Sequence, residues 1–168
     1  WNRTPGTKLS LTTYTNADEV ELLVNGKSYG IKKNDKTNPK MRNQIRWENV
    51  VYQDGNCEAI ARTNGKVVAR HKIVTVGKAV ALKAVADNSD WKADDMDLQH
   101  IRIIAVDSKG RRVPNAVAEV KVNVVGDAQL VAMSNGNINS DELNVTDHQS
   151  LFNGSCLAIL RSGVASSP

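Results

Sequence analysis

The acidic side chains of this sequence suit two kinds of chemistry, cleavage of a glycosidic bond and binding of a metal ion. Glycosidic cleavage needs two carboxylates that face one sugar, and Glu48 stands directly beside Trp47, an attractive pairing for a sugar site. The alternating pattern around them supports the other interpretation, a solvent-facing strand glutamate beside a core tryptophan. We favour this second interpretation and expect no catalytic role for Glu48.

The densest acidic cluster consists of Asp94, Asp95 and Asp97. Carboxylate oxygens suit calcium, but this spacing lacks the glycine and the terminal glutamate of an EF-hand loop. No G-x-S-x-G or glycine-rich phosphate motif is present. We therefore expect a solvated loop, with no metal site, no cofactor and no catalytic residue. Each of the three histidines is isolated in sequence and is expected to be an ordinary strand or loop residue: His71, His100 and His148.

Aromatic side chains are the usual platforms of sugar-binding modules, and here they make up only 4% of the chain. Trp91 lies in the polar, acidic segment 87–97, so it is the best candidate for an exposed ring. The alternative is a loop aromatic that packs over the end of a domain or at a domain junction. Trp91 and, second, Trp47 are the candidate carbohydrate contacts of this chain.

The two cysteines, Cys57 and Cys156, are about a hundred residues apart. No CxxC or Cys/His spacing indicates zinc. Because the two residues fall in different predicted domains, we expect two buried, unpaired thiols that pack as small hydrophobic groups.

Composition excludes several classes of protein. The chain has 40% hydrophobic and 24% charged residues, which is typical of globular domains. It has no run of about 18 apolar residues, so we expect no membrane span. The net charge is only +4, and the nearest basic patch, residues 32–42, is expected to be a solvated loop rather than a nucleic-acid surface.

Alternation of apolar and polar residues dominates the first half of the chain and predicts β-strands. The dipeptides Asn25-Gly26 and Asn64-Gly65 predict tight hairpin turns. Residues 30–44 are mostly polar and are expected to form a long loop. Strands are expected at residues 8–14, 19–25, 45–52, 58–63 and 66–73.

The second half also consists of short predicted strands separated by turns, but it does not repeat the sequence of the first half. Polar loops are expected at residues 87–97 and 134–147. Strands are expected at residues 80–86, 98–107, 118–125, 129–133 and 155–161. No segment shows helical periodicity, and short strands separated by turn residues are typical of β-sandwiches. We therefore predict an all-β protein of two tandem immunoglobulin-like β-sandwich domains, residues 1–77 and 78–168.

Several of these motifs together resemble the sandwich domains that follow the catalytic barrel in bacterial glycoside hydrolase family 2 enzymes of the β-galactosidase type. The resemblance covers nearly the whole chain. In the first half it rests on 14–22 (YTNADEVEL), 25–28 (NGKS), 47–55 (WENVVYQDG) and 77–79 (GKA). In the second half it rests on 93–98 (ADDMDL), 106–110, 113–116 (VPNA), 134–137 (SNGN) and 151–154 (LFNG). Val51 and Asp54 depart from the family, which often has proline at both positions, and Asp95 stands where glycine is common.

The resemblance implies a parent enzyme that is a retaining exo-glycosidase with two glutamates on a separate (β/α)8 barrel, so neither glutamate can be assigned to this chain. It implies a non-catalytic accessory region whose partner is the barrel of the same parent chain, with loops 30–44, 87–97 and 134–150 nearest to it. It also implies a periplasmic, cell-surface or secreted location. Final strands after Pro168 would be missing, which would leave the second sandwich with an unpaired edge.

Two alternatives remain at this point. One is a carbohydrate-binding or adhesion module, which exposed aromatic side chains in one groove would favour. The other is an enzyme in its own right, which would have to act through residues such as Glu48.

Overall fold

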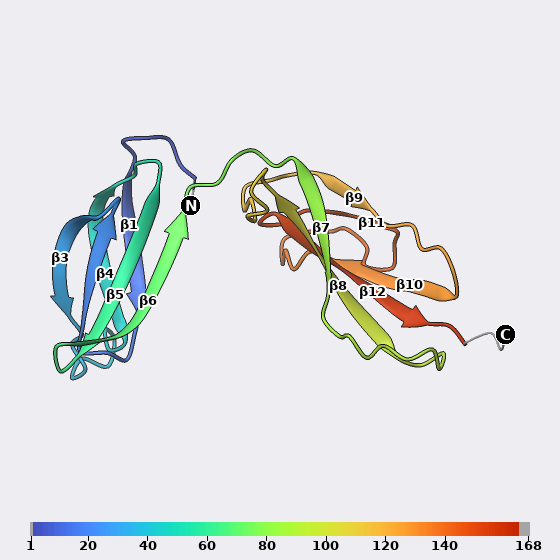
Figure 1. Cartoon of the computed structure of the whole chain (residues 1–168), viewed down its shortest axis with the longest axis horizontal. Coiled ribbons are helices and arrows are strands. Elements are labelled where there is room, and N and C mark those ends of the chain that lie inside the picture. Colours follow the sequence, from blue (N-terminus) through green and yellow to red (C-terminus); the bar gives the residue numbers. More distant parts are fainter. Residues whose placement is uncertain (1, 165–168) are drawn as a thin grey trace. The chain divides into compact units, whose positions relative to one another are not determined.

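The computed structural model describes residues 2–164 and confirms an all-β protein (Figure 1). Two compact units divide the chain, Trp1–Thr75 and Val76–Pro168. The described residues include no helix with the length and apolar character that crossing a membrane requires. Each unit is a sandwich of one four-stranded and one two-stranded antiparallel sheet.

The first unit packs its two sheets around one core. The larger sheet has the order β3-β2-β5-β6, with β3 at Lys27–Lys33, β2 at Glu19–Val24, β5 at Asn56–Thr63 and β6 at Lys66–Val74. The smaller sheet pairs β1 (Lys8–Tyr14) with β4 (Gln44–Val51). Alternate side chains of these strands point inward, as the period of two requires. The buried cluster comprises Ala17, Val20, Leu22, Val24, Ile45, Trp47, Val50, Cys57 and Ala61.

Both predicted Asn-Gly turns are present. Asn25 and Gly26 have φ angles of 50° and 79°, and Asn64 and Gly65 have 49° and 73°. Two consecutive residues with positive φ match the twist of the flanking strands, which is why Asn-Gly is favoured there. These turns set the registers of the β2–β3 and β5–β6 hairpins.

The prediction of a loop from residue 30 was wrong at its start, because β3 continues to Lys33. This strand has few inward apolar residues, since it lies at the edge of its sheet and carries three lysines. Lysine-rich edge strands discourage pairing with other chains and give a weak hydrophobic signal. The hairpin turn, rather than the pattern of the strand, determines that it forms.

The second unit has a larger sheet of order β10-β12-β8-β7, formed by Ala128–Ser134, Ser155–Ser162, Leu98–Val106 and Ala81–Ala86 in that order. The smaller sheet contains only β9 (Glu119–Lys121) and β11 (His148–Ser150). The predicted strand at 118–125 is therefore paired over three residues only, and β11 begins just after the predicted loop 134–147. The buried cluster comprises Ile103, Ala105, Val120, Met133, Leu151, Cys156 and Ala158.

Asp107 joins the start of the second unit to its sheet. Its carboxylate is 1% exposed and forms an ion pair with Arg111 at 2.7 Å. It also accepts hydrogen bonds from the backbone N–H groups of Gly77, Lys109 and Arg111. The Arg111 guanidinium and these N–H groups hold the pKa of the Asp107 carboxyl well below its ordinary value. Because Gly77 is bound in this way and Val76 is buried, both residues belong structurally to the second unit.

Candidate functional site

Trp47 lies inside the core of the first unit, with 2% of its surface exposed. Its indole Nε1 donates a hydrogen bond to Thr13 Oγ1, and Lys32 Nζ lies 5.1 Å from the centre of the ring. A sugar stacks on an exposed aromatic face, and Trp47 has none in this unit. The structure therefore contradicts the carbohydrate contact that we predicted for Trp47.

Trp91 is half-buried in the loop between β7 and β8. Its Nε1 donates to the backbone carbonyl of Asp97 at 3.0 Å, which fixes the ring on its own loop. The residue is only partly exposed, and the predicted carbohydrate contact at Trp91 stays a prediction.

The acidic cluster beside Trp91 organises its own loop. Asp94 Oδ1 accepts hydrogen bonds from the backbone N–H groups of Met96 and Asp97, which lower the pKa of the Asp94 carboxyl. Asp97 Oδ2 accepts from the N–H of Lys92. Within residues 2–164, no three side chains of His, Cys, Asp or Glu come together as a metal site.

Glu48 and the histidines are on the surface. Glu48 lies on β4 and pairs with Arg46 at 2.6 Å, with 55% of its side chain exposed. His71 and His100 are exposed on β6 and β8. His148 lies on β11, and a hydrogen bond to Asp147 raises the pKa of the His148 imidazole. Asp147 also pairs with Lys121, which joins the strand ends of the smaller sheet.

Both cysteines are buried and free, as predicted. Cys57 is on β5 in the first unit and Cys156 is on β12 in the second. Burial raises the pKa of each thiol to about 11.

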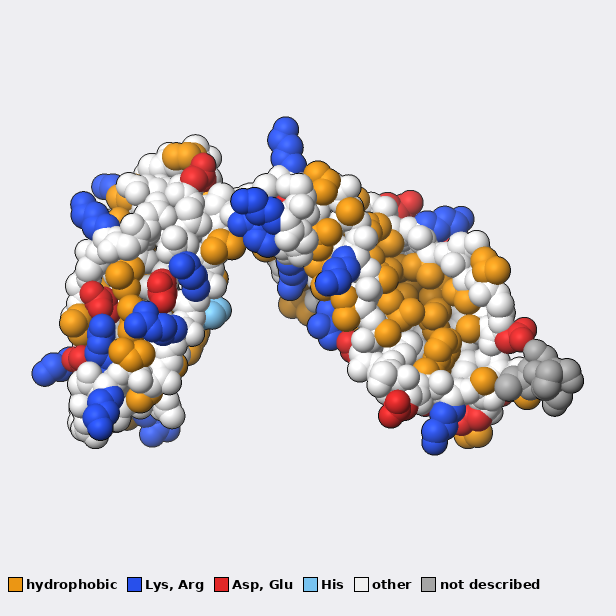
Figure 2. All heavy atoms as spheres, in the orientation of Figure 1, with side chains coloured by type: hydrophobic (Ala, Val, Ile, Leu, Met, Phe, Trp, Pro, Cys, Tyr) orange, Lys and Arg blue, Asp and Glu red, His pale blue; other side chains and the backbone are white. Residues whose placement is uncertain are grey.

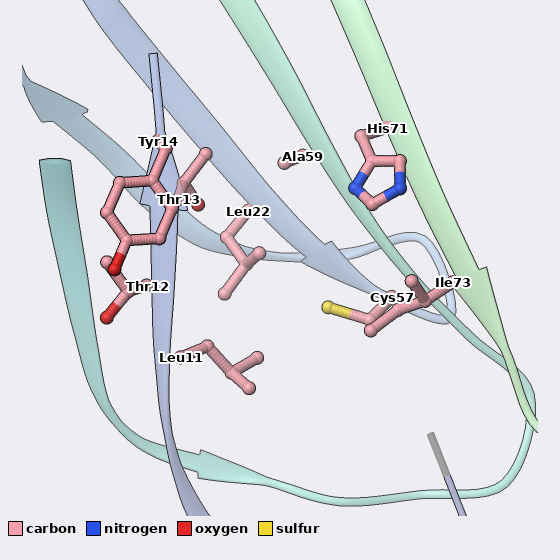
Figure 3. Close-up of a pocket in the computed structure, with 9 residues that line it drawn as sticks. All are labelled: Leu11, Thr12, Thr13, Tyr14, Leu22, Cys57, Ala59, His71 and Ile73. Carbon is pink, nitrogen blue, oxygen red and sulfur yellow. The ribbon is translucent and has the colours of Figure 1, made fainter. Parts of the chain in front are cut away.

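A largely apolar pocket of about 430 Å³ lies within the first unit, where β1 faces β5 and β6 (Figure 3). Leu22 and Cys57 form part of its floor, and Tyr14 and His71 stand at its margins. Tyr14 is 79% exposed. The pocket offers apolar contact area and one imidazole, but its lining includes no carboxylate, so it suits an apolar side chain better than a sugar.

A polar pocket of about 240 Å³ lies in the second unit, and it is formed by the segment from Ser134 to Gln149. Sequence reasoning described most of this segment only as a polar loop. The sequence signal for an ordered segment was its content of Asn, Asp and Ser, because these side chains hydrogen-bond to the nearby backbone in turns. The lining comprises Ser134, Asn135, Gly136, Asn137, Ile138, Ser140, Glu142, Asn144 and Gln149.

Glu142 holds this pocket together. Its carboxylate accepts hydrogen bonds from the N–H of Ser150, from Asn135 Nδ2 and from Ser140 Oγ, at 2.8–2.9 Å. These donors, Ser150 first, lower the pKa of the Glu142 carboxyl. Gln149 is 1% exposed and donates to the carbonyl of Leu143. The loop is therefore a hydrogen-bonded scaffold rather than a loose connection.

This scaffold presents three aliphatic side chains to solvent, Ile138, Leu143 and Val145, which are 95%, 76% and 84% exposed. We call them the loop tip. Exposed aliphatic side chains that form a contiguous patch mark contacts with other proteins, whereas single ones are common on any protein surface. Further hydrophobic side chains gather on the face of the second unit that Figure 2 presents.

Comparison with protein families gives two matches. Residues 82–167 match the family described as "Glycoside hydrolase family 2 C-terminal domain 5". Residues 6–69 match a domain of unknown function, DUF4982.

Individual proteins match along almost the whole chain. The β-galactosidase BoGH2A of Bacteroides ovatus is 37% identical over 163 residues, which is 96% of this chain and 19% of the relative. A putative β-glucuronidase of Formosa agariphila is 32% identical, over 94% of this chain and 15% of the relative. The crystal structure of a glycosyl hydrolase family 2 member from Bacteroides cellulosilyticus has a TM-score of 0.91 and 32% identity, over 99% of this chain and 23% of that one. The chain thus spans about a fifth of the length of the relatives it matches.

Proposed function

Because the chain belongs to glycoside hydrolase family 2, we propose that it is a non-catalytic accessory region of a parent enzyme, packing on the catalytic barrel of the same polypeptide and supporting it. The parent would hydrolyse O-glycosyl bonds with retention, as a β-galactosidase-type enzyme. The observation that carries this proposal is the match of 96% of the chain to 19% of a β-galactosidase. Both a β-galactosidase and a putative β-glucuronidase match, so the sugar of the parent is the open part of the proposal.

The roles of the acidic side chains support an accessory role. Glu142 and Asp107 accept several internal hydrogen bonds each, and Glu48 pairs with Arg46 on a strand surface. In each case the carboxylate stabilises local structure. A glycosidase instead places two carboxylates on either side of one sugar bond.

The loop tip is the surface that we expect to contact the barrel. It combines exposed aliphatic groups with the hydrogen-bonded support around Glu142, so it would lose little conformational entropy on docking. It lies within the segment 134–150, one of the three loops that the family resemblance implies are nearest to the barrel.

Turnover tests the non-catalytic role. The purified chain, incubated with a chromogenic β-galactoside, should release no more product than buffer. Release that disappears in Glu48→Gln would overturn the proposal and make this chain an enzyme in its own right.

Variants of the full-length parent test the supporting role. Ile138→Ser together with Leu143→Ser should lower the temperature at which the parent loses activity. Val68→Ser, at a 57% exposed position on β6, is the control. The same inactivation temperature for both variants would show that the loop tip does not contribute to the interface.

Carbohydrate binding is the second candidate function, because Trp91 is a partly exposed aromatic residue in a polar loop. Titration of the chain with galactosides and host glycans, followed by calorimetry, separates the two roles. Saturable binding that Trp91→Ala abolishes, and that Tyr14→Ala leaves intact, would favour a carbohydrate-binding or adhesion module.

A further inference from the structure

The chain contains four Asn-Gly pairs, and the structure restrains them to different degrees. The pairs are Asn25-Gly26, Asn64-Gly65, Asn135-Gly136 and Asn153-Gly154. Asparagine is a chemically labile residue, most of all before glycine, because glycine has no side chain that hinders its backbone nitrogen from attacking the asparagine Cγ. The attack needs an amide that can turn towards this nitrogen and a peptide that can leave its folded conformation. Hydrogen bonds to the amide or to the peptide therefore slow the reaction.

Asn25 is held by its side chain. Its φ angle of 50° is almost equal to the 49° of Asn64, so the two hairpin turns share one backbone geometry. Asn25 Nδ2 donates a hydrogen bond to the carbonyl of Asp54 at 2.9 Å, and Asn25 Oδ1 accepts one from the N–H of Asn56 at 2.8 Å. Both ends of the amide are occupied, so an attack at Asn25 must first break two hydrogen bonds.

The pairs at Asn135 and Asn153 are restrained in other ways. Asn135 Nδ2 donates to Glu142 Oε2 at 2.8 Å, and Asn135 Oδ1 accepts from a backbone N–H two residues further on. At Asn153 the peptide carbonyl is bound instead, since it accepts from both Nε and Nη2 of Arg112. Gly154, which would supply the attacking nitrogen, is buried. Neither pair is therefore free to react in the folded chain.

Asn64 has none of these restraints. Within residues 2–164, its backbone N–H donates to Asp18 Oδ2 at 2.9 Å, and its side-chain amide makes no hydrogen bond. Asn64 and Gly65 are both exposed. Apart from the chain neighbours of Gly65, no atom lies within 4 Å of the point that a Cβ on Gly65 would occupy. The amide of Asn64 is thus free to turn towards the nitrogen of Gly65.

We propose that Asn64 is a site of spontaneous covalent modification, at which the folded chain converts asparagine to aspartate and isoaspartate. The backbone nitrogen of Gly65 bonds to Asn64 Cγ and loses its proton, and the Cγ–Nδ2 bond breaks to release ammonia. The product is a five-membered succinimide ring. Water then opens the ring at either carbonyl, so that one water is consumed and one ammonia is released in total. The proposal does not depend on the accessory role of the region.

The isoaspartate product changes the hairpin. Its main chain runs through Cβ and Cγ, so the two-residue turn gains one backbone atom. This turn precedes the pairing of Thr63 with Lys66 in the β5–β6 ladder. Because turn length determines the register of a hairpin, the pairing at this end of the ladder should loosen. The aspartate product fits the turn and adds only a negative charge.

Peptide mass spectrometry of the full-length parent tests the proposal. The folded enzyme and the same enzyme in urea are incubated at mildly alkaline pH, and fragmentation assigns each site. In the folded enzyme, Asn64 should convert at least about tenfold faster than Asn25, because two hydrogen bonds hold the amide of Asn25. In urea the two rates should become similar. Equal rates in the folded enzyme, or a difference that persists in urea, would overturn the proposal.

A matched pair of glycine variants tests the ring closure. Gly65→Asn places a side chain on the attacking residue, and asparagine still suits the positive φ of the turn. Conversion at Asn64 should therefore fall severalfold in this variant. Gly26→Asn makes the same change in the other hairpin, where φ is 79° against 73° at Gly65, and should leave the rate at Asn64 unchanged. An undiminished rate in Gly65→Asn would overturn the attack by the nitrogen of residue 65.

Discussion

Asp107 illustrates how much local structure one carboxylate can hold. It accepts hydrogen bonds from Gly77, Lys109 and Arg111, and it is almost completely buried. Asp107→Asn keeps the shape but places an NH2 group against donors, so the second unit should melt at a lower temperature. Circular dichroism on heating measures this, with Asp90→Asn at an exposed loop position as the control. Equal midpoints for both variants would show that the network contributes nothing.

Asp107 also predicts that the second unit loses stability in acid. The pKa of Asp107 is lowered in the folded state, so its stabilising contribution is complete above the unfolded-state pKa of about 3.9 and is lost as the pH falls below it. Urea unfolding of the second unit should therefore show decreasing stability between about pH 4 and pH 2, with a smaller decrease in Asp107→Asn. An unchanged slope in the variant would contradict this assignment.

His148 predicts the opposite pH dependence. Its pKa is raised by Asp147, so its contribution is present below the unfolded-state pKa of about 6.5 and is lost as the pH rises through the folded value. NMR titration of the ring should give a midpoint above about 6.5. Asp147→Asn should lower that midpoint, whereas Asp141→Asn should leave it unchanged. A midpoint that does not respond to Asp147→Asn would show that the ion pair does not raise the pKa of His148.

At the scale of elements, the strand β10 carries both a core residue and a surface residue. Met133 is 0% exposed in the core, and Val131 is 41% exposed. Met133→Ala leaves a cavity and should cost about 2–5 kcal/mol of unfolding free energy in the second unit. Val131→Ala should cost less than about 1 kcal/mol. Chemical denaturation measures both losses. Comparable losses would show that Met133 contributes no more to stability than Val131 does.

Alternation predicted β1 and β2, which turn their aliphatic residues toward the core, and the Asn64-Gly65 turn predicted the hairpin of β5 and β6. Alternation failed for β3 and β11. The edge strand β3 carries lysines where a central strand would carry apolar groups. The strand β11 is three polar residues long, and its buried Gln149 donates a hydrogen bond to the carbonyl of Leu143 in the preceding loop. The Asn25-Gly26 turn produces β3, and pairing with β9 produces β11, so the apolar pattern of the strand itself predicts neither.

The two tryptophans show the same limit of sequence patterns in the prediction of site residues. Period-two alternation placed Trp47 inward, and the structure puts it in the core. Trp91 lies in a loop, where no period applies, so sequence alone could not determine its exposure. Glu142 and the loop tip were missed because their arrangement depends on hydrogen bonds that close a 16-residue segment, Ser134 to Gln149.

At the scale of the whole molecule, family matches confirm the resemblance to glycoside hydrolase family 2 and the all-β fold. The motifs that carried it, such as the Asn-Gly turn after β2, are those whose backbone geometry restricts the residue type. The activity of the parent lies outside what such motifs encode, because turns and cores specify a scaffold rather than a substrate.

The separate cores predict additive effects on stability. The two buried clusters share no residue, and Leu22 is 3% exposed in the first of them. Leu22→Ala should therefore lower the stability of the first unit by about 2–5 kcal/mol. Combined with Met133→Ala, the two losses should add within about 0.5 kcal/mol. A larger deviation in calorimetric scans would reveal coupling between the cores.

Each unit also contains its own reporter of opening, because Cys57 and Cys156 are single, buried and unpaired. With pKa values of about 11, both thiols are protonated at neutral pH and react slowly with alkylating reagents, and their reaction speeds up when the surrounding strands open. Mass spectrometry of tryptic peptides would time the two modifications separately in one sample. The native sequence thus allows the breathing of either half to be followed inside the intact parent, without any engineered label.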